Sequence, residues 1–233
     1  MSLEIEVVED PARACSAMLV GAAAGGGDIV LSGGSTPRAA YGAFVEAVQS
    51  VDIDVSSATL WFGDERCVPP DDDRSNYKMV KESLLDRLGD RAQPQVRRIK
   101  GELGPHAAAE EYERELRQAG PPEFDLILLG IGPDGHTESL FPGQPSLAEK
   151  SRLVVGVEEA GLEPFVPRVS FTLPALATGK QLIVLAAGES KAAAVAAAFG
   201  ESAKPDPLVP SSMVAPVAKE LLVLLDPAAA GRL

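Results

Sequence analysis

The sequence predicts an α/β protein with a mainly parallel sheet that carries helices on both faces. Segments with the pattern of strands alternate with segments with the pattern of helices along all 233 residues, and this alternation is typical of parallel sheets. The apolar run from Phe124 to Leu129, broken only by Asp125, suits a strand that is covered on both sides. The length is enough to bury the core of one domain, residues 1–233.

The first helices carry clear start signals. Asp10 can cap a helix and Pro11 can open it, and three consecutive glycines at 25–27 end it. The next strand runs straight into a glycine loop, after which Thr36 can cap and Pro37 can open a second helix. The expected elements in this part are a strand at 3–8, a helix from 11 to the glycines, a strand at 28–31 and a helix from 37 through 48.

The rest of the chain continues the alternation of strands and helices. A third strand, at 59–62, is followed by a polar loop that contains two prolines, and Ser75 or Asn76 caps the next helix, which extends to residue 88. Residues 105–118 are charged and rich in alanine, which predicts a helix on the surface. The remaining expected elements are strands at 96–99, 124–129, 153–157, 168–171, 182–186 and 221–225 and a helix at 190–199.

The composition limits the classes of partner. With 34 acidic and 21 basic residues, the formal charge of -13 repels nucleic acid and anionic membranes. No apolar stretch approaches the roughly 20 residues that span a bilayer, and the N-terminus lacks the pattern of a signal peptide. Cys15 and Cys67 lie far apart without the spacing of a metal site, which suits a reducing compartment. We therefore expect a cytoplasmic protein, whose cations must be gathered in one place if its ligand is an anion.

The central apolar run stops in a glycine-rich loop that is the strongest site candidate. This loop, residues 130–138, lets the backbone approach a ligand closely and presents Asp134, His136 and Glu138 at a sheet edge. A carboxylate beside a histidine can fix the tautomer of its imidazole and raise its basicity near neutral pH, which makes His136 a candidate base. The other histidine, His106, lies in a charged helix and is interpreted as a surface residue.

The segment SGGSTP, residues 32–37, has the properties of an anion site. It is neither a Walker A loop nor a GxGxxG motif, so nucleotide binding is not indicated. Gly33 and Gly34 let the backbone close on a ligand. Ser35 and Thr36 supply hydroxyl groups, and the helix that follows points its N–H groups at the same place. The alternative is a tight turn from strand to helix with an ordinary cap.

Other charged residues are expected at the same sheet edge. Asp64, Glu65 and Arg66 directly follow a strand; the alternative for them is a surface loop with an internal ion pair. Lys191 lies at a helix start, where a cation opposes the macrodipole, and a bound anion would explain its presence. Arg168, at the start of a short strand, is a weaker signal.

One metal alternative has a spacing argument. Four acidic or hydroxyl side chains take the first, third, fifth and twelfth positions of an EF-hand-like loop, but Asn76 replaces the required glycine and the preceding prolines break any incoming helix. Calcium binding is therefore disfavoured. The four residues are Asp71, Asp73, Ser75 and Glu82.

Together these segments resemble the glucosamine-6-phosphate isomerase/6-phosphogluconolactonase family along nearly the whole chain. Several linked motifs in the family's order are far more specific than any one alone. The resemblance implies a modified Rossmann-like fold similar to that of glucosamine-6-phosphate deaminase. It also implies hydrolysis of 6-phospho-D-glucono-1,5-lactone to 6-phospho-D-gluconate, the second step of the oxidative pentose phosphate pathway, without an obligatory metal or cofactor. The motifs are SGGSTP, DERCVPPDDDRSNY, GIGPDGHTESLFP, PRVSFTLPAL and the segment 188–191.

The resemblance also implies roles for individual residues. His136 corresponds to the family's general base, and Asp134 in the same motif to a partner that orients it. Glu138 stands where the family commonly has a smaller residue, often alanine, so the resemblance assigns it no role. The implied phosphate site consists of Ser35, Thr36, Arg168 and Lys191, next to Gly33 and Gly34. The rest of the implied pocket wall consists of Asp64, Glu65, Arg66 and Asn76.

The hypothesis for the chemistry is that His136 removes a proton from water as the water attacks the lactone carbonyl. Either the N–H groups of the glycine loops or Arg66 can stabilise the oxyanion. The expected partner is a small phosphorylated sugar lactone, bound by a monomer or a small homo-oligomer.

Two alternatives stay open at this point. An aldose-ketose isomerase or deaminase of the same fold shares the GxGxDGH segment, but the deaminases have Asn-Glu-Pro after the histidine loop where this chain has residues 139–142, Ser-Leu-Phe-Pro. A sugar-phosphate sensor without catalysis needs a DNA-binding module. The first expected strand begins at Leu3, which leaves no room for one before it, and the acidic balance disfavours DNA.

Overall fold

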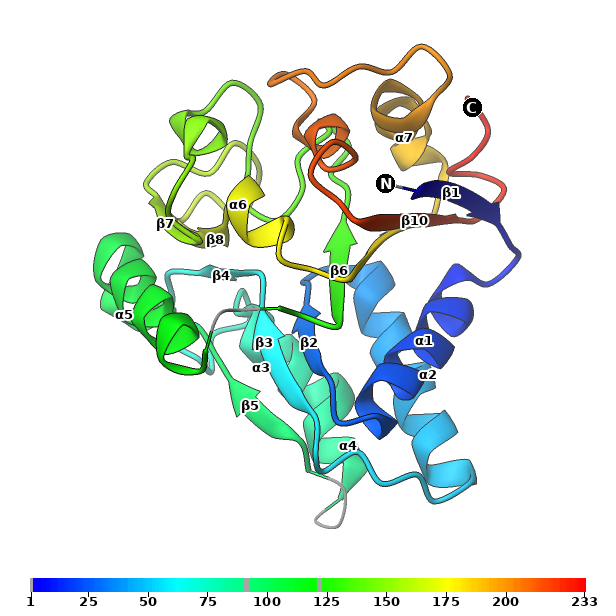
Figure 1. Cartoon of the computed structure of the whole chain (residues 1–233), viewed down its shortest axis with the longest axis vertical. Coiled ribbons are helices and arrows are strands. Elements are labelled where there is room, and N and C mark those ends of the chain that lie inside the picture. The colour runs from blue at the N-terminus through cyan, green and yellow to red at the C-terminus, as the bar shows by residue number, and fades with distance from the viewer. Residues whose placement is uncertain (1, 90–92, 121–122) are drawn as a thin grey trace.

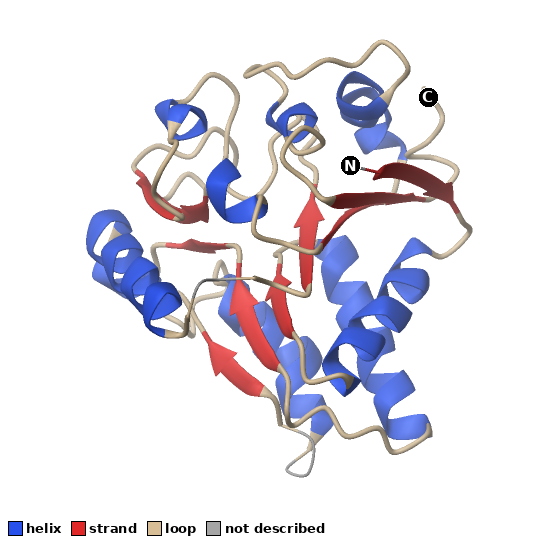
Figure 2. Cartoon of the chain, viewed as in Figure 1, coloured by secondary structure: helices blue, strands red, loops and turns tan. Residues whose placement is uncertain are grey.

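A seven-stranded sheet and a smaller three-stranded sheet form the centre of the structure (Figure 1, Figure 2). The computed structural model describes residues 2–89, 93–120 and 123–233, and both sheets lie within these residues. The large sheet consists of β1 (Ser2–Val7), β2 (Asp28–Leu31), β3 (Thr59–Phe62), β5 (Gln95–Arg97), β6 (Leu126–Gly130), β9 (Gln181–Ala186) and β10 (Glu220–Leu225). The small sheet consists of β4 (Asp64–Arg66), β7 (Val154–Val157) and β8 (Arg168–Phe171).

All neighbouring strands of the large sheet are parallel, in the order β1-β10-β9-β6-β2-β3-β5. Their carboxyl ends therefore lie along one edge. β2 and β6 are neighbours in the middle of this sheet. The chain proceeds outward from β2 through β3 to β5 on one side, and from β6 through β9 to β10 on the other. The loops after β2 and β6 diverge at this point, which is where open α/β sheets bind ligands. The expected α/β class with a mainly parallel sheet is confirmed.

The described residues include seven α-helices, and two of the predicted caps are present. Asp10 accepts a hydrogen bond from the backbone N–H of Arg13 (2.9 Å), and Ser75 accepts one from that of Lys78 (3.2 Å). A wider turn at Lys81–Leu85 joins α3 to α4 in one continuous helical segment. None of the helices in the described ranges is long and apolar enough to cross a membrane. The helices are α1 (Pro11–Ala24), α2 (Ser35–Ser50), α3 (Asn76–Val80), α4 (Asp86–Leu88), α5 (Pro105–Gln118), α6 (Leu173–Leu176) and α7 (Ala192–Phe199).

Helices cover both faces of the sheet, as expected. Successive side chains of a strand point to opposite faces. On β3, Trp61 packs against Tyr112 of α5, whereas Phe62 packs against Tyr77 of α3, each with ring centroids 6.0 Å apart. Figure 1 shows α1 and α2 side by side on the sheet and α5 next to the small sheet. The core between these layers includes the whole of Leu126–Leu129 in β6, the strand on which the candidate loop is mounted.

The start of α2 differs from the prediction that Thr36 caps this helix and Pro37 opens it. The helix begins at Ser35, its N-cap is Gly34 with a φ of 107°, and no side chain caps it. Glycine adopts a positive φ at little cost, so the helix can begin directly after Gly34, before the predicted cap at Thr36. Thr36 therefore lies within the first turn, and the N–H groups of that turn have no capping side chain.

The segment Asp64–Arg66 differs from the predicted loop. It forms β4, which pairs antiparallel with β8, and β8 pairs antiparallel with β7. Three residues are too few to show the alternation of a strand, and the partner strand lies far along the chain, so no local signal indicated this sheet. The helix α5 is also more than a surface helix, because its inner side is buried at Ala108, Ala109, Tyr112 and Leu116.

Candidate active site

A cavity of about 180 Å³ opens at the carboxyl edge of the large sheet. Its wall is formed by the segments that follow β2, β3, β6 and β9, and by β4 and β8 of the small sheet. These are separate parts of the sequence that the parallel topology brings to one edge. The predicted site residues that line the cavity are Gly33, Gly34, Asp64, Arg66, Asn76, His136, Arg168 and Lys191.

His136 and Asp134 form a hydrogen-bonded pair at this cavity. Nδ1 of His136 lies 2.5 Å from Oδ1 of Asp134, which also accepts a hydrogen bond from the backbone N–H of His136 (3.2 Å). Burial alone would raise the pKa of Asp134, but the hydrogen bond and the charge of His136 outweigh it and lower this pKa. An ionised Asp134 holds the proton of His136 on Nδ1, which leaves Nε2 as an acceptor, so the arrangement can supply a general base.

A glycine is required directly behind this pair. A Cβ on Gly132 would overlap with Nδ1 of His136 and lie 2.5 Å from Oδ1 of Asp134. The loop is closed by a hydrogen bond from the N–H of Gly132 to the carbonyl of His136 (2.8 Å), and Gly135 takes a φ of 84°. The close approach of backbone to side chain thus fixes the imidazole in position.

Three cations line the cavity although the chain is acidic overall: Arg66, Arg168 and Lys191. Arg66 and Arg168 lie directly opposite each other on β4 and β8. Burial lowers the pKa of Arg168, whose Nη2 donates to the carbonyl of Pro164 (2.7 Å) and whose Nε donates to that of Val166 (3.1 Å). Burial also lowers the pKa of the half-buried Lys191, which forms no ion pair within the described part of the chain. Such a cluster favours an anionic ligand.

Acidic and amide groups complete the wall on the side of β4. Asn76 donates from Nδ2 to Oδ1 of Asp64 (2.7 Å), and Ser139 donates from its hydroxyl to Oδ2 (2.7 Å). Glu65 does not line the cavity. It is buried behind the wall, where it accepts hydrogen bonds from the N–H groups of Asn76 (2.7 Å) and Tyr77 (2.8 Å). These bonds attach the start of α3 to β4; burial raises the pKa of Glu65 despite them.

Some predicted residues lie beside the cavity, and some lining residues were not predicted. Ser35 and Thr36 lie in the first turn of α2 and are not part of the lining. Phe141 is part of it, with its ring centroid 5.0 Å from that of His136. The position of Phe141 in the loop motif was a sequence signal that could have identified it. Leu162 and Glu163 come from an irregular segment that carries no such signal. Six further lining residues lie in predicted site segments but had no individual role: Ser32 in the segment 32–37, and Gly130, Ile131, Gly132, Pro133 and Glu138 in the loop 130–138. The lining residues outside these two segments are Phe141, Leu162 and Glu163.

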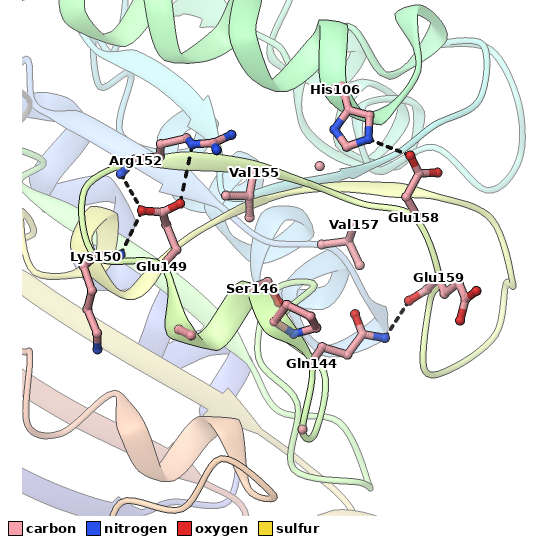
Figure 3. Close-up of a pocket in the computed structure, with 14 residues that line it drawn as sticks. His106, Gln144, Ser146, Glu149, Lys150, Arg152, Val155, Val157, Glu158 and Glu159 are labelled. Atoms are coloured by element: carbon pink, nitrogen blue, oxygen red, sulfur yellow. Dashed lines mark hydrogen bonds and ion pairs between the residues drawn. The ribbon is translucent and has the colours of Figure 1, made fainter.

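A larger hollow of about 820 Å³ lies outside this site (Figure 3), and four of its ionisable side chains form two pairs. His106 lies 2.6 Å from Glu158, and Arg152 lies 3.5 Å from Glu149. His106 is exposed, as predicted. The described residues contain no group of three or more His, Cys, Asp or Glu side chains that could hold a metal ion. The cavity at the sheet edge is therefore the candidate active site, since it combines a histidine base with three cations that form no ion pair with any carboxylate the structure describes.

Comparisons with known proteins identify relatives that match the whole chain. A 6-phosphogluconolactonase from Mycobacterium bovis is 38% identical over 100% of this chain and 99% of its own length. The structure of 6-phosphogluconolactonase from Trypanosoma brucei superposes with a TM-score of 0.84 at 26% identity and covers 100% of this chain and 99% of that one. A monomeric glucosamine-6-phosphate deaminase superposes with a TM-score of 0.82 at 18% identity over 100% of both chains, which shows the shared fold.

The family model described as glucosamine-6-phosphate isomerases/6-phosphogluconolactonase matches residues 3–223. This match includes residues of every strand of both sheets and every segment of the candidate site. The fold, the motifs at the sheet edge and the full-length relative point to the same group. The chain belongs to the glucosamine-6-phosphate isomerase/6-phosphogluconolactonase family.

Proposed function

We propose that this protein hydrolyses 6-phospho-D-glucono-1,5-lactone to 6-phospho-D-gluconate, the second step of the oxidative pentose phosphate pathway. The observation that carries the proposal is the hydrogen-bonded pair of His136 and Asp134 at a cavity whose wall holds three cations. A base and an anion site are what a phosphorylated lactone requires, and relatives that match the whole chain are named for this activity. The match of one family model to residues 3–223 supports a single domain.

In the proposed mechanism, Asp134 keeps a proton on Nδ1 of His136, and Nε2 accepts a proton from water as the water oxygen bonds to the lactone carbonyl carbon. The tetrahedral intermediate then breaks its bond to the ring oxygen. Nε2 returns the proton to this oxygen, which becomes a hydroxyl group of the open-chain product. The new carboxylic acid loses its proton to solvent.

Two groups are candidates for stabilising the oxyanion of the intermediate. Nε of Arg66 is buried and has no hydrogen-bond partner among the described residues, so it can donate to a ligand. The backbone of Gly33 and Gly34 also lines the cavity, whereas the N–H of Gly132 is already bound to the carbonyl of His136. Either arrangement places donors where the negative charge develops.

The phosphate group is expected to bind Arg168 and Lys191 together with the start of α2. The first turn of α2 has no capping side chain, and the N-terminus of a helix binds phosphate through its free N–H groups. Ser35 and Thr36 lie in that turn and contribute hydroxyl groups in this proposal. Binding at this end of the substrate orients the lactone carbonyl toward His136.

The experiment that tests the proposed function is a coupled assay of freshly prepared lactone, corrected with an enzyme-free blank for spontaneous hydrolysis. We expect H136A and H136N to lower kcat by at least about a hundredfold, the contribution typical of a general base. Near-normal turnover by either variant would contradict the role of His136. Release of ammonia from glucosamine 6-phosphate would instead identify a deaminase.

We also propose a cytoplasmic location and either a monomer or a small homo-oligomer. Both cysteines carry free thiols, which agrees with a reducing compartment. Fractionation of the source cells and sedimentation of the purified protein test these two points.

A further inference from the structure

Glu138 is a buried acidic residue that lines the cavity and has no hydrogen-bond donor. Its relative exposure is 6%, and neither carboxyl oxygen has a hydrogen-bond partner among the described residues. Its φ of 50° lies in the left-handed region, which a side chain such as glutamate rarely adopts. A buried carboxylate without a donor is costly, so the position calls for a specific explanation.

The surroundings of Glu138 contain one close partner, which is also an acid. A Cβ on Gly63 would overlap with Oε1 of Glu138 and lie 2.7 Å from Oε2, so the carboxyl group rests on the backbone just before Asp64. Asp64 directly follows Gly63, and a side-chain hydrogen bond with Asp64 is one of the causes that raise the pKa of Glu138. Asp64 already accepts one hydrogen bond at each oxygen, from Asn76 and from Ser139.

Among the described residues, no cation contributes to the shift in the pKa of Glu138. Burial first, and then the charge of Asp64, raise the pKa of Glu138 well above its ordinary value. Tyr41 of α2 and Tyr112 of α5 also feel its charge, and burial raises the pKa of both, so they stay neutral. The other charged or titratable groups of this cavity wall are Arg66 on β4, Arg168 on β8, Lys191 before α7, His136 on the loop of Glu138, and Glu163 from the segment before β8.

We propose that Glu138 is a positioning residue that remains a neutral carboxylic acid and donates its proton to Asp64, so that the two carboxyl groups carry one negative charge between them. This proton gives the carboxyl group of Glu138 a hydrogen-bond partner and holds Asp64 through a third hydrogen bond. It also preserves the excess of positive charge from Arg66, Arg168 and Lys191 for an anionic substrate. The part of the proposal that concerns the substrate rests on the proposed function.

The shared proton is tested first without substrate. In protein labelled with ¹³C at the glutamate carboxyl groups, E138Q removes one resonance and thereby assigns Glu138. We expect this resonance to titrate at a higher pH than every other glutamate except the buried Glu65, and to shift to lower pH in D64N, which removes the adjacent negative charge. E110Q, which removes an exposed carboxylate outside the cavity, serves as the control and leaves the titration of Glu138 in place.

The effect on the substrate is tested by steady-state kinetics with the lactone and by calorimetric binding of 6-phosphogluconate between pH 7 and pH 9. We expect E138A to lower kcat/KM about tenfold, because Asp64 loses a donor, and E138Q to recover most of that loss because its amide still donates. Over the pH range in which the Glu138 resonance titrates, binding by the native protein should weaken more with rising pH than binding by E138Q. Lys191 titrates in both proteins, so the difference between them reports Glu138.

Either of two results would overturn the proposal. The first is a Glu138 resonance that titrates with the exposed glutamates. The second is the same pH dependence of 6-phosphogluconate binding in the native protein and in E138Q over the pH range in which the Glu138 resonance titrates. If the protein does not hydrolyse the lactone, the proposed function fails, but the carboxyl titration still decides whether Glu138 and Asp64 share a proton.

Discussion

A single methyl group at Gly132 should inactivate the site. In G132A the new Cβ would overlap with Nδ1 of His136 and press on Oδ1 of Asp134, so the imidazole must move away from its partner. Because the φ of Gly132 is not in the positive region, alanine can adopt this backbone conformation. The effect of G132A therefore comes from the steric overlap alone. We expect kcat to fall by about a hundredfold, as expected for loss of a general base, while KM changes little.

The matched control for this variant is G21A. Gly21 lies within α1, and a Cβ there would meet no atom within 4 Å. Alanine in a helix interior is more favourable than glycine by up to about 1 kcal/mol, so G21A should be fully active and at least as stable as the native protein. Thermal unfolding of both variants separates a displaced imidazole from a misfolded protein. A G132A variant that folds and retains native kcat would contradict the proposed role of the pair.

At the scale of the residue, short-range relationships could be predicted and long-range ones could not. Asp134 and His136 are two residues apart in one loop, so their contact follows from the sequence. Glu138 lies in the same loop, but its ionisation depends on burial and on Asp64, which belongs to another strand. No pattern within the loop shows which carboxyl group remains ionised.

At the scale of the element, the start of α7 carries a prediction about the phosphate. Lys191 ends the turn Glu189–Lys191 that precedes α7, and it lines the cavity without an ion pair among the described residues. If it binds the phosphate, K191Q should raise KM for the phosphorylated lactone by ten- to a hundredfold, since a hydrogen bond to a charged group contributes about 1.5–3 kcal/mol. It should change KM for the unphosphorylated lactone little.

K150Q is the control for K191Q, because Lys150 is an exposed lysine in the hollow of Figure 3. R168A should show the same selectivity as K191Q, and its thermal unfolding must be measured as well because its guanidinium is held by backbone carbonyls. Equal effects on both lactones would show that these cations do not bind the phosphate.

Elements with local start signals or continuous apolar runs were predicted closely, as β2, β3, β8 and α5 show. The small sheet was not predicted, because β4 has only three residues and its partner β8 comes much later in the chain. The small sheet is important for the site, because the pairing of β4 with β8 places Arg66 opposite Arg168. The proposed anion site therefore depends on a sheet that the sequence did not predict.

At the scale of the whole molecule, a net charge of -13 coexists with a cavity that gathers three cations. The sequence predicts that an acidic protein with an anionic ligand must concentrate its cations in one place. It cannot predict the location of this place, because the three residues come from the segments β4, β8 and the start of α7. Only the parallel order of the large sheet and the adjoining small sheet bring them together.

The buried acid should also make the stability of the whole molecule depend on pH. Glu138 ionises at about pH 4.3 in the unfolded chain and at a higher pH in the folded protein. Between these two values the folded state binds the extra proton, so the native protein loses stability as pH rises. E138Q has no such proton, and its free energy of unfolding should therefore increase relative to the native protein by up to about 1.4 kcal/mol per pH unit.

Denaturant unfolding of both proteins from pH 4.5 to pH 9 measures this difference. The buried Glu65 also has a raised pKa, but it is present in both proteins, so its contribution cancels. We expect the advantage of E138Q to grow from near zero at the acidic end and to level off where Glu138 ionises in the folded protein. A difference that does not change with pH would mean that Glu138 titrates normally. If the stability advantage of E138Q does grow with pH, then Glu138 lowers the stability of the native protein at neutral pH. Functional sites commonly retain such destabilising residues, and here the proton of Glu138 holds Asp64 in place in the proposed site.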